Sequence, residues 1–172
     1  MANKQALREL QSRLAERLSM AKTQPRGKSW LAVECSGRGF LFPLREAGEI
    51  FPLVPLQPVP YSQPWFVGVA NLRGHLHGVV DLAAFLGIKT PDSGREQARL
   101  VGFNLALDLN CALLVDRLSG LRSEEDLIAQ ADDGRPRPAF VGASYLDRAA
   151  RPWQELDLVE LAGDEAFLRI GG

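Results

Sequence analysis

The two histidines of the chain, His75 and His77, are its first candidates for chemistry. Alternate residues of a β-strand point to the same face, so the two imidazoles can form a two-point metal ligand. Asp81 lies four residues further on and shares that face if the strand is unbroken. No third histidine exists, so a metal site would need another ligand from elsewhere in the chain. The simpler interpretation is that both histidines lie at a surface or an interface.

The other residue types that could react show no specific spacing. Gly37-Arg38-Gly39 lacks both phosphate-loop patterns, and the acidic run Glu124–Asp126 after Ser123 is typical of a helix start. Cys35 and Cys111 lie far apart in apolar stretches, which favours two buried, reduced thiols over a disulfide or a metal site. An enzyme is therefore not supported, although a hydrolase or metal enzyme built on the two histidines stays open as an alternative.

The composition is that of an ordinary globular protein. The 172 residues carry 20 Lys and Arg against 21 Asp and Glu, and 46% are hydrophobic. This balance gives no electrostatic reason to expect nucleic acid or an anionic membrane as partner. No stretch approaches the roughly 18–20 apolar residues that cross a bilayer, and residues 1–28 lack the apolar core of a secretory signal. We expect a cytoplasmic protein without direct membrane insertion.

A helix is predicted at the N-terminus, before a region of short strands. Leucines recur at spacings of three and four over residues 4–22, which indicates an amphipathic helix. This helix can pack on its own domain or bind a partner. Strands are then predicted at 30–36, 40–44, 48–54, 76–81, 99–107, 111–115, 140–146 and 153–156, with a helical turn at 82–86 and a closing helix at 158–168. Such a pattern favours barrels or a sandwich over alternating strands and helices.

The segment from Trp65 to Gly87 resembles the signature of the CheW-like family. Its order is an apolar pair, Gly-Val, Asn-Leu-Arg-Gly, a strand, Asp-Leu and a short turn that ends in Leu-Gly. Residues 30–54, with Gly48-Glu49-Ile50, are similar to the family's opening strands, and residues 100–122 are similar to the start of its second half. The resemblance covers roughly residues 30 to 168. The N-terminal helix and the wording Gly-Val-Val-Asp-Leu are similar to the type IV pilus (twitching motility) branch.

This resemblance implies a mainly β fold of two pseudo-symmetric, five-stranded SH3-like β-barrel lobes around a common core, with an N-terminal helix and a few short helices. It places the helix and linker at 1–28, the two intertwined lobes at 29–168 and a tail at 169–172. It implies a non-catalytic adaptor without cofactors, which couples the cytoplasmic tip of a chemoreceptor to the regulatory domain of a CheA-type histidine kinase. Barrel ends would pair lobe against lobe, and receptor helices would lie between lobes. The alternative is a coupling protein of another chemosensory system, flagellar or other.

The resemblance also indicates the residues that would contact partners. They are Ala47, Glu49, Val67, Gly68, Asn71, Arg73 and Gly74. Glycines at 68 and 74 permit a close backbone approach or a positive φ at a turn, and the amide at 71 can hold that turn. The guanidinium at 73 suits a partner's carboxylate or carbonyls, or else clamps the two lobes together.

Other residues of the signature are expected to be structural. Asp81 would accept N–H bonds before the short helix, and the core would receive Val67, Val69, Leu72, Val79, Val80 and Phe85. The chain departs from the family at Val67, where lysine is frequent, at Gly78, where proline is frequent, and at Ala83, where arginine is frequent. These departures bear on the receptor contacts and not on the fold.

Overall fold

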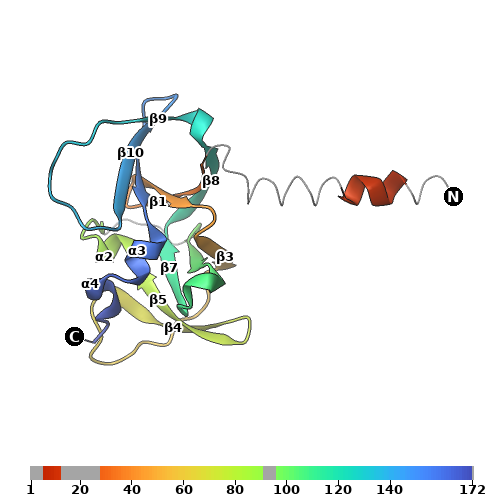
Figure 1. The fold of residues 1–172 in the computed structure, drawn as a ribbon. Helices are drawn as coiled ribbons and strands as arrows, with labels where there is room; N and C mark the ends of the chain where they lie inside the picture. Colours follow the sequence, from red (N-terminus) through yellow and green to blue (C-terminus); the bar gives the residue numbers. More distant parts are fainter. Residues whose placement is uncertain (1–5, 13–27, 91–95, 172) are drawn as a thin grey trace.

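The structure, a computed structural model, describes residues 6–12, 28–90 and 96–171. Residues 6–12 are helical, and the rest of the helix predicted over 4–22 lies outside the described residues. The described strands form two sheets (Figure 1). The first, called lobe 1, contains β1 (Ser29–Cys35), β2 (Arg38–Pro43), β8 (Arg117–Ser123), β9 (Leu127–Ala129), β10 (Val141–Asp147) and β11 (Pro152–Leu156). The second, lobe 2, contains β3 (Ala47–Pro52), β4 (Phe66–Leu72), β5 (His75–Asp81), β6 (Arg99–Phe103) and β7 (Cys111–Val115).

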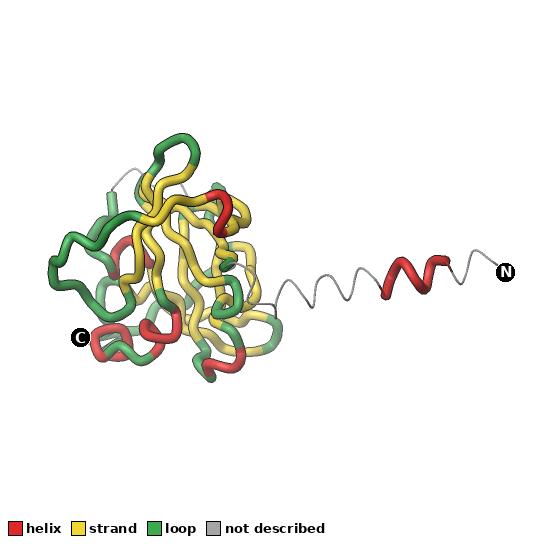
Figure 2. Tube along the Cα trace, turned by 45° about the horizontal axis from the view of Figure 1, so that its top comes forward, coloured by secondary structure: helices red, strands yellow, loops and turns green. Residues whose placement is uncertain are grey.

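Short helices flank these sheets. They are α2 (Leu82–Phe85), α3 (Leu158–Ala162), α4 (Glu165–Leu168) and the 3-10 turns η1 (Leu105–Leu107) and η2 (Glu124–Asp126). Figure 2 shows the strands gathered in the middle of the molecule and the short helices at its periphery. Among the described residues, no helix has the length and apolar character needed to cross a membrane.

Lobe 1 closes through a kinked strand. β8 pairs with β1 and β9 pairs with β10, so residues 117–129 join both ends of the sheet. The kink is η2, where the Asp126 carboxylate accepts the backbone N–H and the hydroxyl of Ser123, at 3.0 and 2.9 Å. The predicted five-stranded barrel therefore has six strand segments here, because this turn divides one strand in two.

Lobe 2 closes in the same way. β3 pairs with β6, and the chain that leaves β3 then pairs at Gln57 with Val69 of β4, through two backbone hydrogen bonds of 2.9 Å. Gly68 permits this closure: it has φ of 142°, and a Cβ there would lie 2.5 Å from the Gln57 carbonyl oxygen. The close approach predicted for this glycine is confirmed.

The two lobes repeat one topology. β11 pairs in parallel with β2 in lobe 1, and β5 pairs in parallel with β7 in lobe 2. Asp157 directly follows β11 and Asp81 is the last residue of β5, and each caps a short helix with its carboxylate. Each also donates its backbone N–H to a carbonyl just before the preceding hairpin, that of Phe140 or Trp65. The expected pseudo-symmetric pair of lobes is confirmed.

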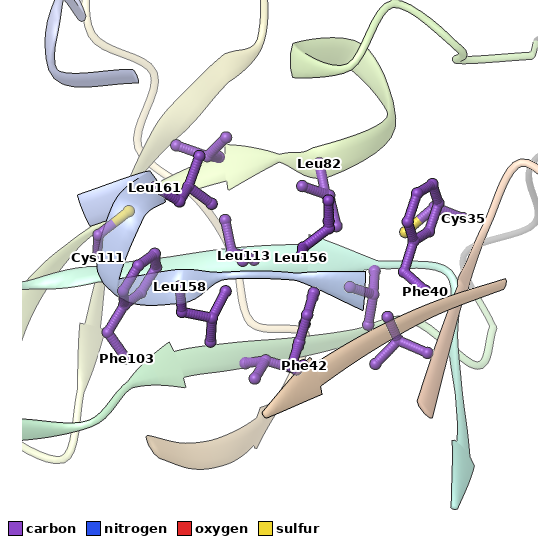
Figure 3. Packing of buried hydrophobic residues seen from close by; sticks show 14 of the residues in the cluster. Cys35, Phe40, Phe42, Leu82, Phe103, Cys111, Leu113, Leu156, Leu158 and Leu161 are labelled. Atoms are coloured by element: carbon purple, nitrogen blue, oxygen red, sulfur yellow. The ribbon is translucent and has the colours of Figure 1, made fainter. Parts of the chain in front are cut away.

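Lobe 2 is inserted into lobe 1, and the two lobes share a core. The chain passes from lobe 1 to lobe 2 between β2 and β3, and returns between β7 and β8. Along β7, Cys111, Leu113 and Val115 face the core between the lobes, whereas Ala112 and Leu114 face the interior of lobe 2. Figure 3 shows side chains from both lobes meeting in the shared core. Because such strands are buried on both faces, they appear in the sequence as unbroken apolar runs.

The other residues expected in the core follow this plan. Leu72, Val79 and Val80 are buried, while Val67, Val69 and Phe85 are half-buried and pack against the core clusters. The two cysteines are free and buried, and burial raises the pKa of each thiol to about 12.

Two predicted elements differ from the structure. The strand predicted over 99–107 ends at Phe103, because the Asn104 side chain accepts the Ala106 N–H at 2.9 Å and starts η1. The helix predicted over 158–168 divides near Gly163, where Asp164 caps a new helix through the Phe167 N–H at 3.0 Å. Strands β4, β8 and β9 were not predicted.

An ion cluster closes the end of lobe 1. Glu34 lies within apolar β1, and its side chain is only 13% exposed. Its two carboxylate oxygens lie 2.6 Å from Nε of Arg117 and 2.7 Å from Nη2 of Arg151. The Arg151 guanidinium also lies over the Trp153 ring, 4.7 Å from its centroid. Glu34 therefore links β1 to β8 and to the β10–β11 hairpin.

Glu34→Ala should lower the free energy of unfolding by about 2 kcal/mol, because the partly buried guanidinium of Arg151 and the exposed guanidinium of Arg117 both lose their counterion. Urea denaturation measures this change. Asp133→Ala is the matched control, since its ion pair with Arg135 is exposed and should contribute less than about 1 kcal/mol. Equal losses in the free energy of unfolding for the two substitutions would show that the Glu34 ion cluster does not stabilise the fold more than an exposed ion pair does.

The β10–β11 hairpin makes stability depend on pH. The Asp147 carboxylate accepts hydrogen bonds from the Trp153 indole N–H and from the backbone N–H groups of Arg151 and Ala149. These bonds, the indole bond first, hold the pKa of Asp147 below its ordinary value of 3.8. Because the pKa of Asp147 is lower in the folded state than in the unfolded state, the ionised carboxylate stabilises the folded protein at pH values above the unfolded-state pKa. This stabilisation is lost as pH falls through the folded-state pKa.

Asp147→Asn should therefore lower the free energy of unfolding at pH 7. The difference in this free energy between the variant and the original chain should shrink as pH falls below about 4. Urea denaturation of both proteins between pH 7 and pH 2.5 measures the two curves. A deficit that stays constant over this range would contradict the role of the ionised carboxylate.

Candidate partner-binding site

The β4–β5 turn presents Arg73 to solvent in a fixed backbone conformation. Arg73 and Gly74 both have positive φ, 53° and 81°, which is the geometry of the tight hairpin turns that match strand twist. The Asn71 side-chain oxygen accepts the Gly74 N–H at 2.9 Å. The turn-holding roles predicted for Asn71 and Gly74 are thus confirmed.

Arg73 pairs with Glu49 across the outside of lobe 2. Nη2 of Arg73 lies 2.5 Å from Oε1 of Glu49, and the side chains are 75% and 40% exposed. Glu49 belongs to β3, so the pair joins this edge strand to the β4–β5 turn of the same lobe. The alternative role of Arg73 as a clamp between the lobes is wrong, because both partners belong to lobe 2 and face solvent.

The remaining predicted contact residues lie beneath this surface. Ala47 is half-buried on β3 against the shared core, Val67 is half-buried on β4 against the interior of lobe 2, and Gly68 is buried. The structure therefore brings Glu49 and Arg73 into contact beside Asn71 and Gly74 and places the other three residues as support. Sequence reasoning gave no role to Gly48, where a Cβ would lie 2.3 Å from the Phe103 carbonyl oxygen.

Two departures from the family have structural consequences. A Cβ at Gly78 would lie 2.9 Å from the Phe66 ring, so the glycine lets that aromatic side chain pack closely on β5. Ala83 is buried in the shared core, where an arginine would need a counterion.

The histidines and Asp81 do not form a joint site. His75 is exposed, and the His77 ring lies against Phe51, with centroids 6.1 Å apart. Asp81 is buried, caps α2 through the Ala84 N–H and forms an ion pair with Lys89, which confirms its structural role. Within residues 6–12, 28–90 and 96–171, no three His, Cys, Asp or Glu side chains converge in a way that could hold a metal ion.

Sequence reasoning missed an apolar border of the shared core. Leu44, Leu107, Leu109 and Leu118 are half-buried there, and Leu121 on β8 is 62% exposed. For Leu118 and Leu121 the only sequence signal was their spacing, because their segment lacks the apolar alternation of a strand. An exposed leucine beside half-buried ones can receive the apolar stripe of an amphipathic helix.

Comparison with known proteins agrees with this architecture. The chain is 31% identical over 110 residues to protein PilI of Pseudomonas aeruginosa, covering 64% of this chain and 61% of that protein. It is 30% identical over 100 residues to a probable chemotaxis protein CheW of Rhizobium etli, covering 58% and 63%. The matches thus take in about three fifths of the length of each relative.

A solved structure has the same fold. The crystal structure of scaffolding protein TtCheW from Thermoanaerobacter tengcongensis superimposes with a TM-score of 0.63 at 17% identity, covering 79% of this chain and 88% of that one. The family model described as CheW-like domain matches residues 29–166. On this match, which spans both lobes, the chain belongs to the CheW-like domain family.

Proposed function

We propose that this protein is a non-catalytic, cytoplasmic adaptor that couples the cytoplasmic tip of a chemoreceptor to the regulatory domain of a CheA-type histidine kinase. We further propose that it serves type IV pilus twitching motility. The observation that carries the proposal is a CheW-like pair of lobes whose second lobe presents an exposed Glu49–Arg73 pair on a rigid turn. Similarity to a protein named PilI supports the pilus branch.

The kinase domain would bind the end of lobe 2. Glu49, Asn71, Arg73 and Gly74 are exposed there and would make the direct contacts. A surface ion pair contributes little to folding, so both charged groups can exchange their mutual contact for contacts with a partner. Because the turn is preformed, binding would order few additional groups.

The receptor would bind at the apolar border between the lobes. Leu118 is half-buried against the shared core, and Leu121, on the same strand, is exposed. An amphipathic helix recognises such a surface through apolar residues spaced three and four apart. A receptor tip made of helices meets this requirement.

The second candidate is a coupling protein of another chemosensory system, flagellar or other. Similarity at nearly the same identity to a probable chemotaxis protein CheW favours this alternative. It uses the same surfaces and differs only in the kinase that binds. Titration with the kinase domains of each system separates the two candidates.

Calorimetric titration with the regulatory domain of the cognate pilus kinase should give a dissociation constant in the micromolar range, which corresponds to a binding free energy of about −8 kcal/mol. Arg73→Glu should weaken this binding at least about tenfold, or 1.4 kcal/mol, because it places two carboxylates side by side at the contact. Its melting temperature should stay nearly unchanged, since the side chain is exposed.

Arg135→Glu is the matched control, because Arg135 is another exposed arginine in an ion pair, in the loop before β10 of lobe 1. This variant should bind the kinase domain normally. Loss of binding in both variants, or in neither, would contradict a contact at the end of lobe 2. No binding of the original chain to a folded kinase domain would overturn the kinase coupling itself.

A further inference from the structure

Strand β8 leaves an apolar edge uncovered. It pairs with β1 along one side, and in the described part of the chain no strand pairs with its other side. Leu121 is 62% exposed on this strand, and half-buried Leu118 packs against the shared core. A free strand edge that also carries an exposed leucine favours association with other chains unless something covers it.

The N-terminal segment joins the body of the protein beside this edge. The Lys28 N–H donates to the Glu124 carboxylate at 3.3 Å, and the Lys28 carbonyl accepts the Glu124 N–H at 3.0 Å. Ser29 pairs with Ser123, the last residue of β8. The chain before residue 28 is therefore tethered two or three residues from Leu121.

Residues 6–12 offer a matching apolar face. Leu7 and Leu10 are 57% and 56% exposed, and leucines three residues apart lie on one side of a helix. A helix this short is marginal by itself in water, so it gains stability by packing on an apolar surface. Residues 13–27 separate it from Lys28, and such a length of chain can span at most about 50 Å.

We propose that the helix of residues 6–12 docks through Leu7 and Leu10 on the Leu118–Leu121 face of β8 in its own chain. The tether raises the effective concentration of the helix at this face to the millimolar range, which suits a small apolar contact. Docking covers the free edge. If the receptor binds the same border, which rests on the proposed function, then the helix competes with it.

A spin label on the helix tests this docking in the full chain. Ser12→Cys places a thiol away from the leucine face, and a maleimide nitroxide should react there alone because both native thiols are buried. The label should cause selective loss of the amide signals of Leu118 and Leu121 in an NMR spectrum. The amide of Leu76, which is 65% exposed in lobe 2, should keep its intensity.

Leu7→Asp combined with Leu10→Asp, in the same labelled protein, separates docking from mere tethering. Both side chains are exposed, so the body stays folded, and the signals of Leu118 and Leu121 should recover. Losses that persist in this variant, or no selective loss in the first protein, would overturn the proposal. Losses in a mixture of isotope-labelled chains and spin-labelled chains would assign the contact to a second copy, which also overturns it.

Discussion

The core between the two lobes is the constraint on which the rest of the structure depends. β7 sends Leu113 into this core and Leu114 into lobe 2, and β1 and β2 are likewise buried on both faces. Because the chain leaves lobe 1 after β2 and returns to it after β7, lobe 1 consists of two separate chain segments with the whole of lobe 2 between them. Separating the lobes would expose apolar residues of both sheets, at roughly 25 cal/mol for each Å². The two barrels therefore form one cooperative unit that presents fixed surfaces.

That rigidity suits the adaptor role proposed for the protein. Gly68 closes lobe 2 against Gln57, and Asn71 fixes the turn that carries Arg73. The exposed charges at this end contribute little to folding and remain free to meet a partner. The structural ion cluster lies elsewhere, around Glu34 in lobe 1, so the proposed contact surface and this cluster use different residues.

Residue patterns predicted the strands that are buried on both faces, since unbroken apolar runs bounded by glycine, asparagine and proline identify them. The pairing of strands from distant parts of the chain came only from the family resemblance, because the insertion of lobe 2 between β2 and β8 leaves no local signal. β8 was missed since Gly120 and charged residues interrupt its leucines. Glu34 was visible only as a charge within an apolar strand. The clamp alternative for Arg73 failed because its partner, Glu49, lies in the same lobe.

Native-state hydrogen exchange tests the shared core most directly. If both lobes unfold as one unit, the slowest amides of β2 in lobe 1 and of β7 in lobe 2 exchange only through global unfolding. Their opening free energies should then equal each other and the free energy of unfolding from urea denaturation. Opening of one lobe's slowest amides at a free energy lower by more than about 1 kcal/mol would show that the lobes unfold separately, and would contradict a common core.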